Sequence, residues 1–265
     1  MNDHHRFGST DDHDSAGHPW AGRTFQPNPA AGDDGAADPV LLAALEACAS
    51  GTGSRAAVVD ALRNARLLVP LLAEAGTIGR TASGRLVEKT QELSLVTVAG
   101  PGGRPVLPAF TSVGAMQAWN PAARPVPSEA RLVALAAGAE GSAVVLDPTS
   151  PTEFALRRPM LAALATGEPW VAPWDDDALW AAYGAWMEAE PEVLAIDIGP
   201  VRAMSGLVDP DVFVVLTVGS DLPEPEAQAI GERADAVWRR VEAAFDGPDS
   251  VAVAVVRPGD LLGGA

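Results

Sequence analysis

Short apolar segments, separated by glycine- and proline-rich turns, constrain the fold of this chain most. Each has the length of a buried strand. Between them lie stretches with apolar residues at helical spacing, introduced by Asp, Ser or Thr and ended by Gly or Pro. Strands occur both in a hairpin pattern and beside helices. This mixture favours an α+β fold over a doubly wound sheet of parallel strands.

The first half of the chain is expected to hold five helices and four strands. The helices are predicted to begin at Pro39 behind an Asp38 cap, after Ser54, after Thr111 or Ser112, after Ser128 and at Pro159. The strands are predicted at 67–72, 93–98, 105–110 and 143–146, with a loop at 76–84.

Two of these expectations are specific enough to be tested by a structure. The alternating segment 93–98 runs through the turn 100–103 into 105–110, which predicts a β-hairpin. In the helix after Ser128, residues Leu132, Val133 and Leu135 are predicted to face inward, and Gly138 to mark the end of the helix.

The second half is expected to alternate helix and strand. Asp175 to Asp177 are predicted to begin a helix, because acidic residues in a first turn complement the helix dipole. A long amphipathic helix is predicted at 223–245, and strands are predicted at 193–198, 212–218 and 251–256.

Charge is unevenly distributed along the chain. Residues 1–38 carry seven acids and two bases, residues 39–167 nine acids and eleven bases, and residues 168–265 nineteen acids and five bases. The change from a net +2 to a net −14 near residue 168 predicts a domain boundary. We expect a disordered tail at 1–37, an α+β domain at 38–172 and an acidic α+β domain at 173–265. The negative field disfavours nucleic acid and anionic membrane surfaces as partners.

The cellular compartment is predicted from the sequence features that are missing: a transmembrane segment, a secretory signal and a second cysteine. There is no run of about 18 apolar residues, which predicts no transmembrane helix. The first residues lack the basic start and apolar core of a secretory signal. With Cys48 as the single cysteine, no intrachain disulfide can form, so we expect a cytoplasmic protein.

Three motifs, in this order, resemble the N-terminal domain of the SseB family, named for enhanced serine sensitivity. They are LSLVTV leading to LPAFTS (93–98 and 107–112), AW leading to RPVP (118–119 and 124–127), and VLDP before an apolar helix (145–148). The resemblance spans roughly residues 55–172, and the acidic half is similar to the C-terminal partner domain of that family. It implies an α+β fold, with no catalytic residues or cofactor to carry over.

Catalytic chemistry is poorly represented. All four histidines, at positions 4, 5, 13 and 18, lie in the expected tail, which argues against Ser-His-Asp and Cys-His catalysis in a folded site. Cys48 lies on the apolar face of a helix and is interpreted as a core residue. We therefore expect no catalytic residue, no metal site and no cofactor.

The glycine-rich loops and the acidic clusters have simpler interpretations. The loops at 76–81 and 100–104 lack the Gly-Lys-Ser/Thr of a phosphate-binding loop, so turns are favoured. Asp209 and Asp211 flank a proline, and together with 175–177 they are interpreted as turn and first-turn residues rather than cation ligands.

A group of aromatic residues is the candidate binding surface. Its members are Trp170, Trp174, Trp180, Tyr183 and Trp186. Trp180, Tyr183 and Met187 are expected to share one helical face. Such a group can anchor a partner protein, and it can equally fill a core or join two domains.

Two functions are consistent with these patterns. The first is a non-enzymatic protein-binding or adaptor protein that uses the aromatic group and the acidic half. The alternative is a binding protein or enzyme for amino acids or other small metabolites, with Arg157 and Arg158 beside a cleft between the two domains.

Overall fold

The computed structural model describes residues 32–73, 78–80, 86–88, 93–208, 210–242 and 251–258. The tail predicted to be disordered lies outside these residues up to position 31, as do all four histidines and Asp209. Residues 35–265 form one compact unit, and its helices and mixed sheets confirm the α+β class. Among the helices described, none combines the length and apolar character needed to cross a bilayer.

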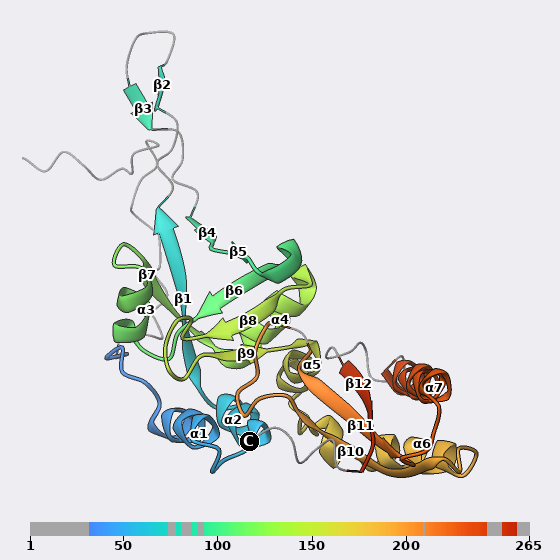
Figure 1. Ribbon diagram of the computed structural model, residues 1–265. Coiled ribbons are helices and arrows are strands. Elements are labelled where there is room, and N and C mark those ends of the chain that lie inside the picture. The colour runs from blue at the N-terminus through green and yellow to red at the C-terminus, as the bar shows by residue number, and fades with distance from the viewer. Residues whose placement is uncertain are drawn as a thin grey trace, which may run out of the picture. The chain divides into compact units, whose positions relative to one another are not determined.

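The helices and strands occur in the following order along the chain (Figure 1). The helices are α1 (Pro39–Ala49), α2 (Arg55–Leu62), α3 (Val113–Trp119), α4 (Ala130–Glu140), α5 (Arg158–Thr166), α6 (Asp177–Met187) and α7 (Glu224–Glu242), with short 3-10 turns η1 (Pro101–Gly103) and η2 (Pro173–Asp175). The strands are β1 (Arg66–Ala73), β2 (Ile78–Arg80), β3 (Leu86–Glu88), β4 (Leu93–Leu95), β5 (Val98–Ala99), β6 (Pro105–Ala109), β7 (Arg124–Glu129), β8 (Ala143–Leu146), β9 (Phe154–Leu156), β10 (Val193–Pro200), β11 (Val212–Val218) and β12 (Val251–Val256).

Several helix starts agree with the sequence because a side chain caps them. The Asp38 carboxylate accepts hydrogen bonds from the backbone N–H groups of Val40 and Leu41 at the start of α1. Ser54 caps α2 and Ser112 caps α3 in the same way, through the N–H groups three residues later. At the other end of α5, Gly167 adopts the left-handed conformation that stops the helix.

Two sheets make up the first half of the chain. One has the order β4-β1-β7 and is antiparallel throughout, and the other has the order β5-β6-β8-β9, in which β6 and β8 are parallel. The sheets meet where Leu68 and Phe110 exchange two backbone hydrogen bonds of 2.8 and 2.9 Å. β2 and β3 pair antiparallel; β2 falls in the region 76–84 that was predicted to be a loop, and β3 follows that region.

The main core lies between these sheets and four helices. Apolar side chains from α1, α2, α4 and α5 pack there against β1, β6, β8 and β9, with Leu41, Val58, Leu62, Val144 and Phe154 fully buried. Burying such a side chain contributes roughly 1.5–3 kcal/mol, so this core accounts for much of the stability of the fold.

The predicted hairpin is only partly correct. The turn at 100–103 exists, and β5 pairs with β6 through Val98 and Ala99. The preceding strand β4, however, pairs with β1. The segment 93–98 therefore divides between two sheets, because residues 96 and 97 belong to neither strand.

The helix after Ser128 also differs from expectation. Residues 124–129 form β7, which was not predicted, and Ser128 lies in that strand rather than at a cap. The helix α4 continues past Gly138 to Gly141, which is left-handed. Val133 is buried as predicted, but Leu132 and Leu135 are 52% and 43% exposed. Alanines 130, 134 and 137 occupy the buried face instead, since they allow α4 to pack closely.

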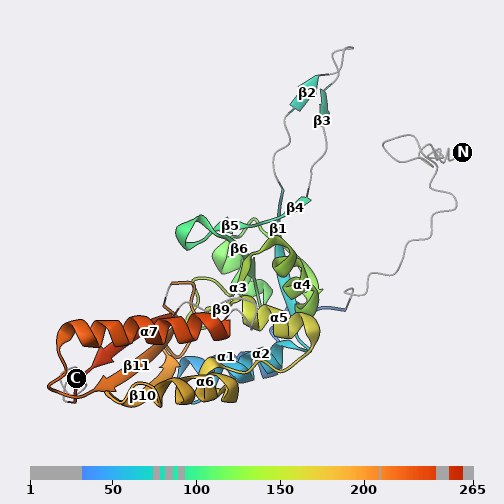
Figure 2. The same cartoon turned by 90° about the vertical axis from the view of Figure 1, so that its right-hand side faces the viewer.

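The second half forms a three-stranded sheet of order β10-β11-β12, antiparallel between β10 and β11 and parallel between β11 and β12. Both α6 and α7 contribute to a second core with one face of this sheet, where Val212, Val214 and Leu216 are fully buried. Figure 2 shows α7 running along the strands. The helices and strands predicted for this half are confirmed, except that residues 243–245 of the predicted long helix lie outside the described ranges. The domain boundary near residue 172 stays a prediction.

Candidate protein-binding surface

The loop between β10 and β11 lies against the first half of the chain. Its base closes through a hydrogen bond from Val201 N–H to the carbonyl oxygen of Asp211. Its middle reaches the first half of the chain, where Ala155 N–H in β9 donates to the carbonyl oxygen of Ser205. Leu207 packs on the face of the β6–β8–β9 sheet opposite the main core. The loop therefore covers an edge and part of a face of that sheet.

A buried arginine holds this loop in place. Arg55, at the start of α2, donates from Nη1 to Asp211 Oδ2 at 2.7 Å, and the two side chains are only 2% and 4% exposed. Its Nη2 donates to the carbonyl oxygens of Arg202 (2.7 Å) and Met204 (3.2 Å), and its Nε to that of Ala203 (3.2 Å). We call Arg55, Asp211 and these three carbonyl groups the loop clamp. It was not predicted from the sequence.

Arg157 joins the clamp from the start of α5. Its Nε donates to the carbonyl oxygen of Gly206 at 2.9 Å and lies 3.6 Å from Asp211 Oδ2. The side chain is buried, whereas the neighbouring Arg158 is exposed. Arg157 thus faces the β10–β11 loop, and the structure does not bring the two arginines to a common ligand site.

Three of the five candidate aromatic residues lie beside the clamp. The Trp170 and Trp174 rings meet edge to face with centroids 6.4 Å apart, and Trp170 is buried in the main core. The Arg55 guanidinium lies over the Trp174 ring, 5.4 Å from its centroid. Trp180 donates from Nε1 to the carbonyl oxygen of Trp174 at 2.8 Å. These contacts tie η2 and α6 to the clamp.

Tyr183 is part of the second core. Its ring is fully buried, and its hydroxyl donates to the carbonyl oxygen of Ala234 in α7 at 3.2 Å. Burial raises the pKa of Tyr183 far above its ordinary value, and the negative charge of Asp235 adds to the shift. Trp180, Tyr183 and Met187 all pack against this core, as their helical spacing predicts.

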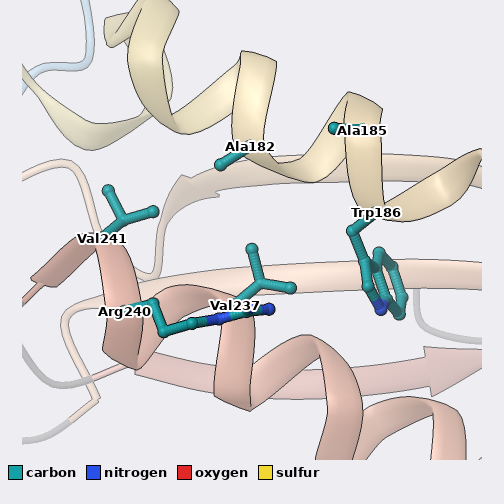
Figure 3. Close-up of a pocket in the computed structure, with 6 residues that line it drawn as sticks. All are labelled: Ala182, Ala185, Trp186, Val237, Arg240 and Val241. Atoms are coloured by element: carbon teal, nitrogen blue, oxygen red, sulfur yellow. The ribbon is translucent and has the colours of Figure 1, made fainter.

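Trp186 lies beside an open groove between α6 and α7. The groove has a volume of about 450 Å³ and is lined by Ala182, Ala185, Trp186, Val237, Arg240 and Val241. Figure 3 shows the α6 side chains facing those of α7 across it. The partly buried indole of Trp186 meets the Tyr183 ring edge to face with centroids 6.1 Å apart, which fixes its position. The sequence pointed to Trp186 but not to the α7 wall, whose valines were assigned to an ordinary amphipathic helix.

Elsewhere, one carboxyl group links the ends of two parallel strands. Asp147 follows β8 with a left-handed backbone (φ 43°), and its side chain is buried. Its carboxylate accepts from the N–H and the hydroxyl of Thr111, just after β6, at 2.8 and 2.7 Å. Burial raises the pKa of Asp147, and these hydrogen bonds oppose that shift. Both carboxylate oxygens are therefore used within the protein.

Few other candidate metal-binding or catalytic groups occur within the described ranges. No group of three or more His, Cys, Asp or Glu side chains there could hold a metal ion. Asp211, considered as a turn residue in the sequence, is instead the carboxylate of the loop clamp.

Cys48 is expected to resist alkylation while the protein is folded. The side chain is 1% exposed, and its Sγ donates to the carbonyl oxygen of Ala203 at 3.4 Å. Burial raises the pKa of the thiol more than the charge of Arg55 lowers it, so little thiolate forms. Iodoacetamide labelling followed by mass spectrometry should proceed at least roughly tenfold more slowly in buffer than in denaturant. Equal rates would contradict a core role for Cys48.

Comparison with protein-family models now adds an independent observation. Residues 41–163 match the model of the SseB protein N-terminal domain. This chain contains an SseB N-terminal domain. Comparisons with curated proteins and with solved structures gave no match.

The matched SseB domain contains only one side of the loop clamp. Arg55 and Arg157 lie within it, whereas Asp211 and the groove lie beyond its end. The SseB match therefore supports the family and the fold of the first half. A role of the five aromatic residues in partner binding stays a prediction.

Proposed function

We propose that this protein, which contains an SseB N-terminal domain, is a non-enzymatic binding protein that holds an apolar side chain of a partner protein in the groove between α6 and α7. The observation that carries the proposal is a partly buried tryptophan, Trp186, that lines an open groove with Val237 and Val241 on the opposite wall. Tryptophan beside an apolar pocket is the residue type that most often dominates protein–protein affinity.

Charge supports a protein partner with basic residues around the apolar side chain. Residues 168–265 carry nineteen acids against five bases, which favours encounter with a basic surface. Arg240 is the charged side chain of the groove and can pair with a carboxylate of the partner. The partner is therefore expected to present an apolar side chain and an acidic group within a mainly basic surface.

Replacing Trp186 by alanine is expected to abolish partner capture. Truncation of a central tryptophan weakens binding by about 2 kcal/mol or more, which is roughly thirtyfold. The measurement is quantitative mass spectrometry of proteins retained by tagged full-length protein from native lysate, at low and high salt. Capture should be salt-sensitive.

The matched control is Leu132→Ala, since Leu132 is 52% exposed on α4 and outside the groove. It should retain every partner, and both variants are checked for an unchanged circular dichroism spectrum and melting temperature. A folded Trp186→Ala variant that keeps all partners would refute the proposal. Stabilisation of the wild-type protein by millimolar amino acids, lost in Trp186→Ala, would instead assign the groove to a small metabolite.

A further inference from the structure

Within the described ranges, no strand pairs with the outer edge of β12, and the strand itself carries no charged side chain. β12 is the last strand of its sheet and pairs with β11 on its inner side only, among the described residues. Its six residues, Val251–Val256, are all valine or alanine. An edge of this kind presents a row of backbone N–H and C=O groups to which another strand can add. Proteins normally block such edges with charges, prolines or bulges.

The opposite edge of the same sheet is blocked in just this way. β10 has a bulge between Val193 and Ala195, an exposed charge at Asp197 and a proline at its end, Pro200. Each of these features hinders the addition of a strand. The sheet is therefore protected at the β10 edge and not at the β12 edge. This difference indicates that a further strand pairs with β12.

Local charge permits that neighbour to be a second copy of this chain. The acidic half as a whole would repel itself, but two ion pairs of α7 and of the residue after β12 lower the net charge there. Arg257, directly after β12, pairs with Glu224 of α7 at 2.8 Å, and Arg239 pairs with Asp235 at 2.7 Å. α7 lies directly on β12, since a Cβ on Gly231 would be 3.2 Å from Val255 Cγ2. Both ion pairs therefore involve α7, the helix that lies on β12, or the residue that follows β12.

We propose that two copies of this chain pair antiparallel through β12 about a twofold axis, which joins their sheets into one of six strands. Residues directly opposite in an antiparallel pair share a face of the sheet. Pairing Val253 with its own counterpart sets Val251 opposite Val255 and Ala252 opposite Ala254. The valines that pack against the helices then stay on the helix-covered face in both copies. A twofold contact is closed, so it joins only two copies. The features that block the β10 edge prevent a third copy from pairing there.

This dimer is independent of the proposed groove, since no groove residue lies in β12. The first test is the mass of the full-length wild-type protein by light scattering and by sedimentation, over a wide concentration range. Twice the chain mass is expected at micromolar concentrations. A monomer at every concentration overturns the proposal.

Two charged variants test the pairing itself. In Ala252→Asp/Ala254→Asp, each aspartate would lie opposite an aspartate of the other copy, so this variant is expected to be monomeric. The lysine counterpart, Ala252→Lys/Ala254→Lys, should be monomeric for the same reason. An equimolar mixture of the two should form a heterodimer, because opposite charges then face one another.

Ala195→Asp, on the blocked β10 edge, is the matched control and should leave the dimer intact. Circular dichroism confirms that each variant is folded. If a charged variant fails to fold, Val253→Cys is used in the otherwise unchanged chain, in which Cys48 is buried. It should form a disulfide with its own counterpart under mild oxidation. Dimers that persist in both folded charged variants, or a cysteine variant that does not cross-link, overturn the proposal.

Discussion

Replacing Arg55 by alanine is expected to lower the free energy of unfolding by about 3–5 kcal/mol. Removing one partner of a buried ion pair leaves the other charge poorly compensated in a poorly solvated site, and Arg157 Nε at 3.6 Å is a weaker partner for Asp211 than Arg55. Here Asp211 loses its 2.7 Å contact, and three carbonyl groups of the β10–β11 loop lose a donor. Trp174 also loses the cation above its ring. Urea unfolding followed by tryptophan fluorescence measures the change.

The control is Arg131→Ala, the same substitution at an exposed arginine of α4, which should change stability by no more than about 0.5 kcal/mol. Because the clamp connects the SseB domain to the loop of the second sheet, Arg55→Ala should also broaden or split the unfolding transition. A loss similar to that of Arg131→Ala, in one sharp transition, would show that the clamp contributes little.

Replacing Asp147 by alanine is expected to destabilise the protein by about 2–3 kcal/mol. The substitution removes two hydrogen bonds from Thr111 and places alanine at a left-handed φ of 43°. Asparagine tolerates this backbone and can still hydrogen-bond with Thr111, so Asp147→Asn should cost about 1 kcal/mol or less at neutral pH.

The pH dependence of stability separates the effect of the Asp147 charge from the effect of its side-chain geometry. Its folded-state pKa lies above the ordinary value of 3.8, so the native state holds the proton more tightly than the unfolded chain does. The contribution of this group to stability therefore falls as pH rises from about 3.8 through the raised pKa. Asp147→Asn should remove that slope, so the difference between wild type and variant should change across this window. Parallel stability curves would contradict a raised pKa.

The sequence predicted most helices and strands because their ends are set by local chemistry. Asp38, Ser54 and Ser112 cap helices whichever way the rest of the chain folds, and Gly167 stops one in the same way. The errors arise where pairing with a strand that is distant in sequence determines the structure. β4 leaves the expected hairpin to pair with β1, a partner more than twenty positions earlier that no local pattern reveals. Similarly, β7 contains Pro125 and Pro127, which disfavour a strand locally, yet it pairs with β1 over its whole length.

The candidate surface was predictable only in part. The aromatic group was visible from spacing, but burial separates its members, with Tyr183 inside the core and Trp186 beside the groove. The clamp was not visible, since Arg55 and Asp211 are 156 positions apart and neither has an unusual neighbour in sequence. The charge counts include Arg55 in the first half of the chain and Asp211 in the second, but they do not indicate that the two side chains are in contact.

The ribosome synthesises Arg55 and Arg157 of the clamp well before Asp211 and the β10–β11 loop. When the SseB domain has emerged, the β10–β11 loop that covers β9 and the apolar patch of Val106, Val145 and Ala155 does not yet exist. Vectorial synthesis therefore leaves a sheet edge and an apolar patch open until the chain beyond residue 211 is available. During that interval the nascent chain presents the surface that molecular chaperones bind, and slowing translation after the SseB domain should prolong it.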